Sequence, residues 1–332
     1  MSGKELYREF AKTEESLPIF SKSWWLDTVC GNDLAWDAIM VTDEDTNMVA
    51  FPFCHTMNRF GPTAIIMPGL TQTLGPYFKI RENTKLSKIQ ETKKTLCYSL
   101  IGQLPRFKYF DMKFHRSFTN WQPFYWKGFQ QTTRYSSRIQ KDQTEEQVFN
   151  GINKRLRTYI RKNESNLNVE VGNDVSEIWD INEDTFDRKD NSIPYTLDFL
   201  KRLDSACQEH DCRRILISRN ESGNIMAFSY LVWDSEDVYL LLGGRNPAYD
   251  KTNIKASLVW ESIKFALSMG KNLDFEGSMM EGVQHFNSLF GSSVEPYSSI
   301  KKSILTPYDG IIQNACKKLI PYSINNLQRR AD

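Results

Sequence analysis

The fold of this chain is decided by residues 237–278, which read DVYLLLGGRNPAYDKTNIKASLVWESIKFALSMGKNLDFEGS. The apolar run 238–242 predicts a strand, the segment from Asn253 predicts a helix, and residues 273–276 predict a second strand. Two strands joined by a crossover helix form a βαβ unit, in which the strands are parallel and the helix begins beside the end of the first strand. Because a helix start presents unpaired amides, this geometry predicts a site for an anion.

The neighbouring segments predict a sheet around this unit. Residues 213–218 and 225–233 are further strand-like runs bounded by turn-forming residues. We therefore expect three antiparallel strands, the crossover helix and then a parallel strand, with a turn at residues 243–245. Other expected strands are 35–41, 48–55, 107–114, 132–139 and 168–171, and other expected helices are 21–30, 85–103, 175–188 and 196–210.

A basic helix is expected after residue 143. Thr144 and Gln147 form a capping box, which predicts one long helix from this point. Five basic residues lie within nine positions of it: Lys154, Arg155, Arg157, Arg161 and Lys162. They describe either a solvated face or a patch for phosphate groups, because guanidinium forks match phosphate oxygens.

Length and composition limit the class of protein. The 332 residues exceed one typical hydrophobic core, so two domains are expected. A formal charge of +1 provides no global field for a polyanion. The first residues lack the apolar core of a signal peptide, and no run is long enough to span a membrane, which predicts a cytoplasmic protein. The six dispersed cysteines predict reduced thiols and no metal site.

Two places in residues 237–278 carry candidate chemistry. The helix predicted from Asn253 has Asn253 as its capping residue and Lys255 in its first turn. The amides of its first turn would hold a phosphate, or the segment is an ordinary capped helix. Asp274 and Glu276 alternate with apolar residues and are expected on one side of their strand. Glu276 would serve as a general base on an amine, anchor an ammonium group, or form a structural salt bridge.

Several of these stretches resemble a known family. They are residues 149–162 (FNGINKRLRTYIRK), residues 223–230 (GNIMAFSY), the 243–245 turn and residues 273–278 (LDFEGS), with Phe290, Gly291 and Tyr297. Together they resemble the FemAB-related, BioF2-like branch of the GNAT acyltransferase superfamily over roughly residues 134–302. Residues 24–27 (WWLD) and 70–76 (LTQTLGP) are similar to bacterial relatives of that branch.

The resemblance implies an α/β protein of two GNAT-like domains, each with a mixed, mostly antiparallel sheet flanked by helices. The implied domains are residues 1–133 and 134–332. The implied activity is transfer of an acyl, acetyl or aminoacyl group to an amine on a small metabolite or a cell-wall precursor. Acyl-CoA and aminoacyl-tRNA stay open as donors. The glycine-rich pyrophosphate loop is missing at residues 251–256, and so is the long helical insertion of some tRNA-using members.

The resemblance also orders the candidate residues into one hypothesis. The arginines contact phosphate groups of donor or acceptor, the amides around Asn253 hold the other ligand's phosphate, and Glu276 orients or deprotonates the amine in a cleft lined by tyrosines. The catalytic candidates are Glu276 and Tyr239, and the substrate- or donor-binding candidates are Arg155, Arg157, Arg161, Tyr230, Arg245, Asn253, Lys255 and Ser278.

Two other readings of the sequence stay open. In the first, the chain is a non-catalytic GNAT-fold module that binds a nucleotide-linked ligand or RNA through the basic residues of 154–162. The missing glycine loop favours this interpretation. Alternatively, residues 311–330 would contact a membrane surface, because apolar and basic residues alternate there, although Pro321 interrupts the helix and a packed terminal helix has the same pattern.

Overall fold

The computed structural model describes residues 1–31, 34–56, 64–164, 167–187 and 193–304. The chain divides into two compact units, each assembled from separate stretches. Unit 1 contains Met1–Thr13, Val29–Thr132 and the described residues from Ser298 onward, and unit 2 contains Glu14–Thr28 and Thr133–Tyr297. The division into independently folding domains 1–133 and 134–332 stays a prediction.

Unit 1 is a sheet with helices. Its strands follow the order β1-β2-β3-β5-β12, and β4 pairs with β2. β3 and β5 are parallel, and the other pairs are antiparallel. The elements are α1 (Gly3–Thr13), β1 (Leu34–Thr42), β2 (Met48–Thr56), β3 (Ala64–Ile66), β4 (Tyr77–Lys79), α3 (Leu86–Gln103), β5 (Tyr109–Phe114), α4 (Gln122–Trp126) and the final residues of β12 (Ser293–Ser303).

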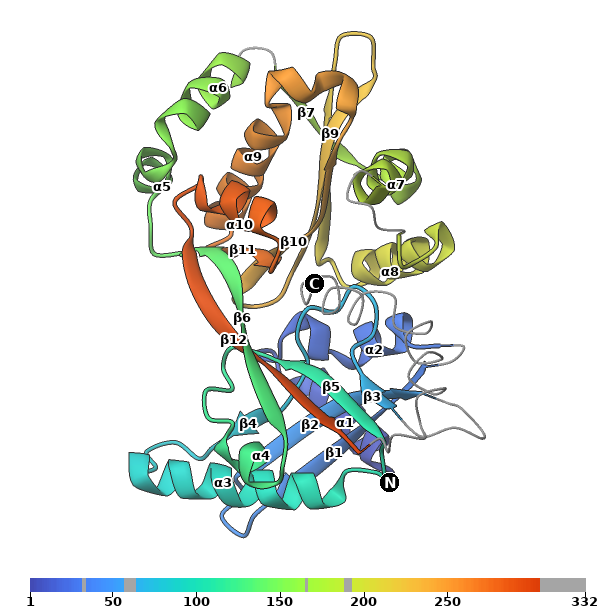
Figure 1. Cartoon of the computed structure of the whole chain (residues 1–332), viewed down its shortest axis with the longest axis vertical. Helices are drawn as coiled ribbons and strands as arrows, with labels where there is room; N and C mark the ends of the chain where they lie inside the picture. The colour runs from blue at the N-terminus through green and yellow to red at the C-terminus, as the bar shows by residue number, and fades with distance from the viewer. Residues whose placement is uncertain (32–33, 57–63, 165–166, 188–192, 305–332) are drawn as a thin grey trace, which may run out of the picture. The chain divides into compact units, whose positions relative to one another are not determined.

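Unit 2 carries the βαβ segment (Figure 1). Its strands follow the order β6-β11-β10-β9-β8-β7, with the first residues of β12 beside β6. Its elements are η1 (Ile19–Ser21), α2 (Ser23–Val29), β6 (Gln130–Ile139), α5 (Glu145–Gly151), α6 (Lys154–Glu164), β7 (Asn168–Gly172), η2 (Val175–Ile178), α7 (Trp179–Asp187), α8 (Leu197–Glu209), β8 (Arg213–Arg219), β9 (Ile225–Trp233), β10 (Asp237–Arg245), η3 (Pro247–Thr252), α9 (Ile254–Ser268), β11 (Asn272–Gly277) and α10 (Glu281–Ser288).

The predicted fold class is confirmed in both units. β10 and β11 are the expected parallel pair, joined by α9, while β7, β8, β9 and β10 pair antiparallel in sequence order. The Asn220 side chain accepts from the amides of Ser222 and Asn224, which closes the β8–β9 hairpin as the turn-rich sequence predicted. A mixed sheet flanked by helices is the result.

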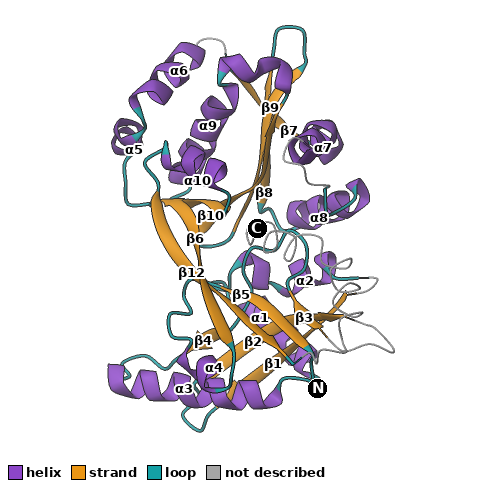
Figure 2. Ribbon diagram, viewed as in Figure 1, coloured by secondary structure: helices purple, strands orange, loops and turns teal. Residues whose placement is uncertain are grey.

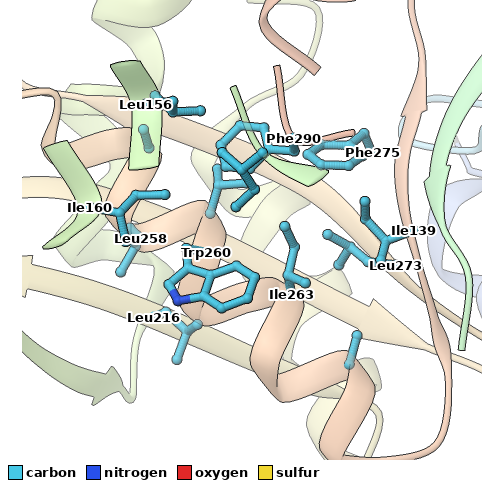
Figure 3. Packing of buried hydrophobic residues seen from close by; sticks show 14 of the residues in the cluster. Ile139, Leu156, Ile160, Leu216, Leu258, Trp260, Ile263, Leu273, Phe275 and Phe290 are labelled. Atoms are coloured by element: carbon cyan, nitrogen blue, oxygen red, sulfur yellow. The ribbon is translucent and has the colours of Figure 1, made fainter. Parts of the chain in front are cut away.

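Helices cover the sheet of unit 2 on two sides (Figure 2). α5, α6 and α9 lie on one face, and α7 and α8 lie on the other. The core between α9 and the strands is apolar, because α9 is buried over most of its length. Figure 3 shows Phe275 of β11 beside Phe290, and Trp260 and Ile263 of α9 in the same cluster. This packing fixes where α9 starts relative to β10 and β11.

Two local predictions are wrong. The expected long helix after residue 143 is two helices: α5 begins at the predicted capping box of Thr144 and Gln147, but Ile152 is extended and the chain restarts as α6. Asn153 causes the restart, because its side-chain oxygen accepts the amides of Arg155 and Leu156. Residues 243–245 are not a turn but the last residues of β10.

The segment 311–330, considered above for membrane contact, lies outside the described residues. In the part of the chain that the structure describes, no helix has the length and apolar character needed to cross a membrane.

Candidate functional site

The site is built where β10 and β11 part. Asp237, Val238 and Tyr239 pair with Asn272, Leu273 and Asp274, and within these fully described strands no later residues of the two are paired. β10 has a register shift against β9 between Leu240 and Leu242. β11 has one against β6 between Asp274 and Gly277. Beyond this point, the backbone N–H and C=O groups that β10 and β11 turn toward each other do not bond to one another. A ligand can therefore hydrogen-bond to them.

The two glycines of β10 differ in what surrounds them. A Cβ atom on Gly244 would lie 2.5 Å from the Phe228 ring and 2.9 Å from the Thr185 hydroxyl of α7, so packing requires the glycine. A Cβ atom on Gly243 would meet only the Phe228 carbonyl at 3.7 Å and a Leu240 methyl group at 3.8 Å. The strand at Gly243 therefore leaves a side-chain-sized space open.

Lys255 lies beside this open stretch of β10. Its Nζ is 3.5 Å from the Gly243 carbonyl oxygen and 5.3 Å from the centre of the Phe286 ring of α10. The first turn of α9 thus places a cation against the same strand residue that has an open side. The predicted binding role of Lys255 stays a prediction, and its position next to the parting strands supports it.

Glu276 occupies a strained position at the end of β11. Its φ is 60°, in the left-handed region, which costs a non-glycine residue of order 1–3 kcal/mol. Asp274 holds it there: its Oδ1 accepts the Glu276 amide at 2.8 Å and also the Ser136 hydroxyl. The positive φ interrupts the pleat of β11 at Glu276, and the predicted placement of Asp274 and Glu276 on one side of the strand stays a prediction.

Tyr297 and Arg134 lie close to Glu276. A Cβ atom on Gly277 would be 2.5 Å from the Tyr297 hydroxyl oxygen, so the glycine lets β11 lie against that ring. Burial raises the pKa of Tyr297, while the charge of Arg134 and its hydrogen bond lower it and the Glu276 charge raises it. The Tyr297 phenol, the Arg134 guanidinium and the Glu276 side chain therefore lie together at this end of β11.

A buried ionic cluster braces this end of the sheet. Arg138 of β6 is 4% exposed, and its guanidinium contacts Asp237 of β10, Glu295 of β12 at 2.7 Å and Asp274 of β11 at 3.6 Å. Charges buried in this way are tolerated only when they are paired. Asp274 thus joins the cluster to Glu276.

The start of α9 is already largely satisfied by the protein. The Ile254 amide lies 3.3 Å from the Thr252 hydroxyl, and the Ala256 amide donates to the Asn253 carbonyl. Asn163 of α6 donates to the Thr252 carbonyl and to Ser257. Asn253 is the N-cap residue of α9, as the sequence predicted, but it has a φ of 54° and its side chain makes no capping hydrogen bond. The helix start offers fewer amides to a phosphate than the sequence suggested.

The predicted basic stripe lies on α6. Arg155 and Arg161 are exposed, and their guanidiniums stack over Tyr159 at 5.9 Å and Phe149 at 5.2 Å. Arg157 is partly exposed, and its Nη1 is 3.4 Å from the Asn150 side-chain oxygen. Among the described residues none of the three is paired with a carboxylate. Their positive charge is available to an anionic partner.

Both tyrosine candidates are core residues. Tyr230 is fully buried and donates to Asp204, and burial raises its pKa. Tyr239 is 2% exposed, donates to Asp234 at 2.9 Å, and packs on the Phe20 ring with 4.9 Å between centroids. Their roles at a ligand stay predictions, and neither enters the function proposed below.

Two further candidates lie at element ends. Arg245 is the last residue of β10, opposite Ala227 of β9. Ser278 follows β11, and its hydroxyl accepts the Met280 amide at 3.1 Å just before α10. The structure therefore gives Ser278 a local turn bond, and the ligand role predicted for both residues is untested.

Sequence reasoning missed Arg138 and gave Tyr297 no role of its own. The signal for Arg138 was only a basic residue within the strand-like run 132–139. The signal for Tyr297 was only its place in the family resemblance. Among the described residues no cluster of histidine, cysteine, aspartate or glutamate side chains is grouped as metal ligands would be.

Known proteins share both the domain and the fold. The acetyltransferase (GNAT) domain family matches residues 150–279. The structure of FemX superposes with a TM-score of 0.63 at 11% identity, covering 93% of this chain and 98% of that one. L-PGS from Bacillus licheniformis gives 0.54 at 13% identity, covering 96% of each chain.

A third similar structure is the C-terminal domain of a putative lysylphosphatidylglycerol synthetase from Agrobacterium fabrum, with a TM-score of 0.52 at 10% identity and 96% of each chain covered. No curated protein sequence matches the chain. Residues 150–279 thus match a GNAT acetyltransferase domain, and the chain shares the fold of FemX over 93% of its length, which agrees with the resemblance found in the sequence.

Proposed function

We propose that unit 2 transfers an acyl group directly to an amine, with the donor carbonyl bound where β10 and β11 part. The observation that carries the proposal is the loss of pairing after Tyr239 and Asp274, in strands whose residues are all described. Backbone amides on such an edge can donate to a carbonyl oxygen that gains negative charge as the amine attacks. Direct transfer needs alignment more than a side-chain nucleophile.

Glu276 is the group proposed to receive the amine's proton. The Asp274 bond to its amide and its positive φ fix its backbone at the end of β11, beside the parting strands. A carboxylate there attracts an ammonium group and accepts a proton as the new amide bond forms. We further propose that the phenol of Tyr297, whose pKa burial raises, donates its proton to the leaving oxygen or sulfur of the donor.

Aminoacyl-tRNA is the donor class that we favour over acyl-CoA. Two amides in the first turn of α9 already bond to Thr252 and Asn253, which leaves a poor cradle for the pyrophosphate of coenzyme A. The three arginines of α6, in contrast, have no carboxylate partner among the described residues and suit a long polyanion such as RNA. The acceptor is proposed to be an amine on a cell-wall precursor or small metabolite in the cytoplasm, as the family resemblance implies.

The test compares donors on the full chain. Labelled aminoacyl-tRNA and acetyl-CoA are each incubated with the protein and a panel of amines that includes peptidoglycan-precursor peptides, and amide products are followed by mass spectrometry. We expect amide product from aminoacyl-tRNA, and a loss of about 100-fold or more in rate for Glu276→Gln with tRNA binding retained.

Each contrary result has its own meaning. Product from acetyl-CoA alone would overturn the donor assignment and keep acyl transfer. Salt-dependent tRNA binding without product from any amine would overturn catalysis in favour of the non-catalytic binding module. Full activity of Glu276→Gln would remove Glu276 from the reaction. Lys94→Glu, a charge reversal at an exposed residue of α3 in unit 1, is the matched control for tRNA binding.

A further inference from the structure

Two cysteines of unit 1 meet although they are far apart in the sequence. The sulfur atoms of Cys30 and Cys54 are 3.2 Å apart, although the two residues are 24 positions apart in the sequence. Cys30 follows α2, and Cys54 lies within β2. A disulfide needs two sulfur atoms to approach in this way from backbone positions that can be bridged. The pair therefore differs from a dispersed set of thiols.

The backbone on both sides of the pair is held in place. Cys54 is opposite Trp36 of β1 and Ile66 of β3, so it lies inside a paired strand. Next to Cys30, Gly31 and Leu34 exchange both backbone hydrogen bonds, at 2.8 and 3.0 Å. Neither sulfur atom can move far from the other while these bonds persist.

The two thiols have different surroundings. Cys54 is fully buried, whereas Cys30 is partly exposed. Burial raises the pKa of Cys54, and the hydrogen bond with Cys30 raises it further. Because the thiolate is the reactive form and must be reached by the oxidant, Cys30 is the thiol that reacts first.

We infer that Cys30 and Cys54 form a reversible dithiol–disulfide site, in which a peroxide oxidises Cys30 and Cys54 resolves the product. The Cys30 thiolate attacks one peroxide oxygen, which breaks the O–O bond, forms a sulfenic acid and releases water after protonation. The Cys54 sulfur then attacks the sulfenic sulfur, the S–O bond breaks, and a second water leaves. Two thiols and one hydrogen peroxide give one disulfide and two waters.

The bond would tie the residue after α2 to the middle of β2. It closes the segment that contains β1, and reduction by a dithiol opens it again. The inference does not depend on acyl transfer, since both cysteines belong to unit 1 and none of the residues proposed for transfer do.

The chain contains its own comparison pair. Cys207 and Cys212 of unit 2 are also neighbours, with the Cys212 sulfur 3.4 Å from the Cys207 carbonyl oxygen. Both are buried, at 0% and 7% exposure. The hydrogen bond with the Cys212 thiol, followed by burial, raises the pKa of Cys207 as well. Without an exposed member, this pair should react with peroxide more slowly.

The experiment maps disulfides in the full chain. The protein is treated with hydrogen peroxide for increasing times, blocked with an alkylating reagent, digested without reductant and analysed by mass spectrometry. We expect a linked peptide that joins Cys30 to Cys54, formed before any Cys207–Cys212 link and lost on treatment with dithiothreitol. In Cys54→Ser, the sulfenic acid of Cys30 should persist and be trapped by dimedone.

Two results on the wild-type chain would overturn the inference without any variant. One is complete alkylation of Cys30 after peroxide treatment, which would show an inert thiol. The other is oxidation of Cys30 to sulfinic acid with Cys54 still free, which would show that the second sulfur does not resolve the first.

Discussion

The carboxylate of Asp274 accepts the backbone N–H of Glu276 at 2.8 Å and is contacted by the buried guanidinium of Arg138 at 3.6 Å. One side chain therefore couples an ionic cluster in the sheet interior to the strained residue at the end of β11. The strain at Glu276 is held by neighbours that are fixed. This is the arrangement expected when the position of a carboxylate matters more than stability.

Substitutions at Glu276 should separate the stability of the fold from the activity of the site. Glu276→Ala and Glu276→Gly both remove the carboxylate, but only glycine adopts a φ of 60° without a Cβ penalty. We expect Glu276→Gly to be more stable than Glu276→Ala by about 1 kcal/mol, measured by urea denaturation. Neither variant should transfer an acyl group. Equal stabilities would show that the backbone is not strained there.

The two glycines of β10 provide a matched pair. Gly244→Ala places a methyl group against Phe228 and Thr185, so we expect a loss of about 2 kcal/mol in unfolding free energy. Gly243→Ala meets no atom closer than 3.7 Å and should change stability by less than about 0.5 kcal/mol.

The same Gly243→Ala variant tests the ligand position. If the donor carbonyl binds against β10 at this point, the added methyl group should raise KM for the donor in a protein of normal stability. Unchanged kinetics in Gly243→Ala would move the donor away from this strand residue.

The free energy of unfolding should depend on pH in part through the protonation of Asp234. Burial, followed by the charge of Asp237, raises the pKa of Asp234 above 3.8. The folded protein then holds this proton more tightly than the unfolded chain. The contribution is fully present below pH 3.8 and is lost as pH rises through the raised pKa.

This contribution is isolated by Asp234→Asn, which does not titrate. The unfolding free energy of wild type minus that of Asp234→Asn should decrease between pH 4 and pH 7, measured as denaturation curves at a series of pH values. A difference that stays constant or increases over that range would contradict the raised pKa.

Arg157 should contribute to tRNA binding through charge. In Arg157→Glu we expect weaker binding and a plot of log affinity against log salt that is shallower by about 1. Fluorescence anisotropy with labelled tRNA measures both. Among the described residues, the polar partner of the Arg157 side chain is the neutral Asn150 side chain at 3.4 Å, so the fold should persist. If Lys94→Glu on α3 has an equal effect, the stripe on α6 has no special role.

Much of the fold could be predicted from local patterns. The apolar runs of β8, β9, β10 and β11 and the capping box of α5 are set by neighbouring residues, so they are visible in the sequence. The break before α6 was missed because Asn153 reads equally well as a residue inside a helix. The end of β10 was missed because Gly243 and Gly244 suggest a turn, while packing against Phe228 is what requires Gly244.

The sequence by itself determined the βαβ unit, the basic residues of α6 and the presence of a carboxylate near the end of β11, since each depends on residues close together in the chain. The tertiary structure decided which of them share a site. It paired Arg138 with Asp237, Asp274 and Glu295, placed Tyr297 beside Gly277, and buried Tyr239 away from solvent. These relationships come from strand register and packing between distant segments, which no local pattern encodes.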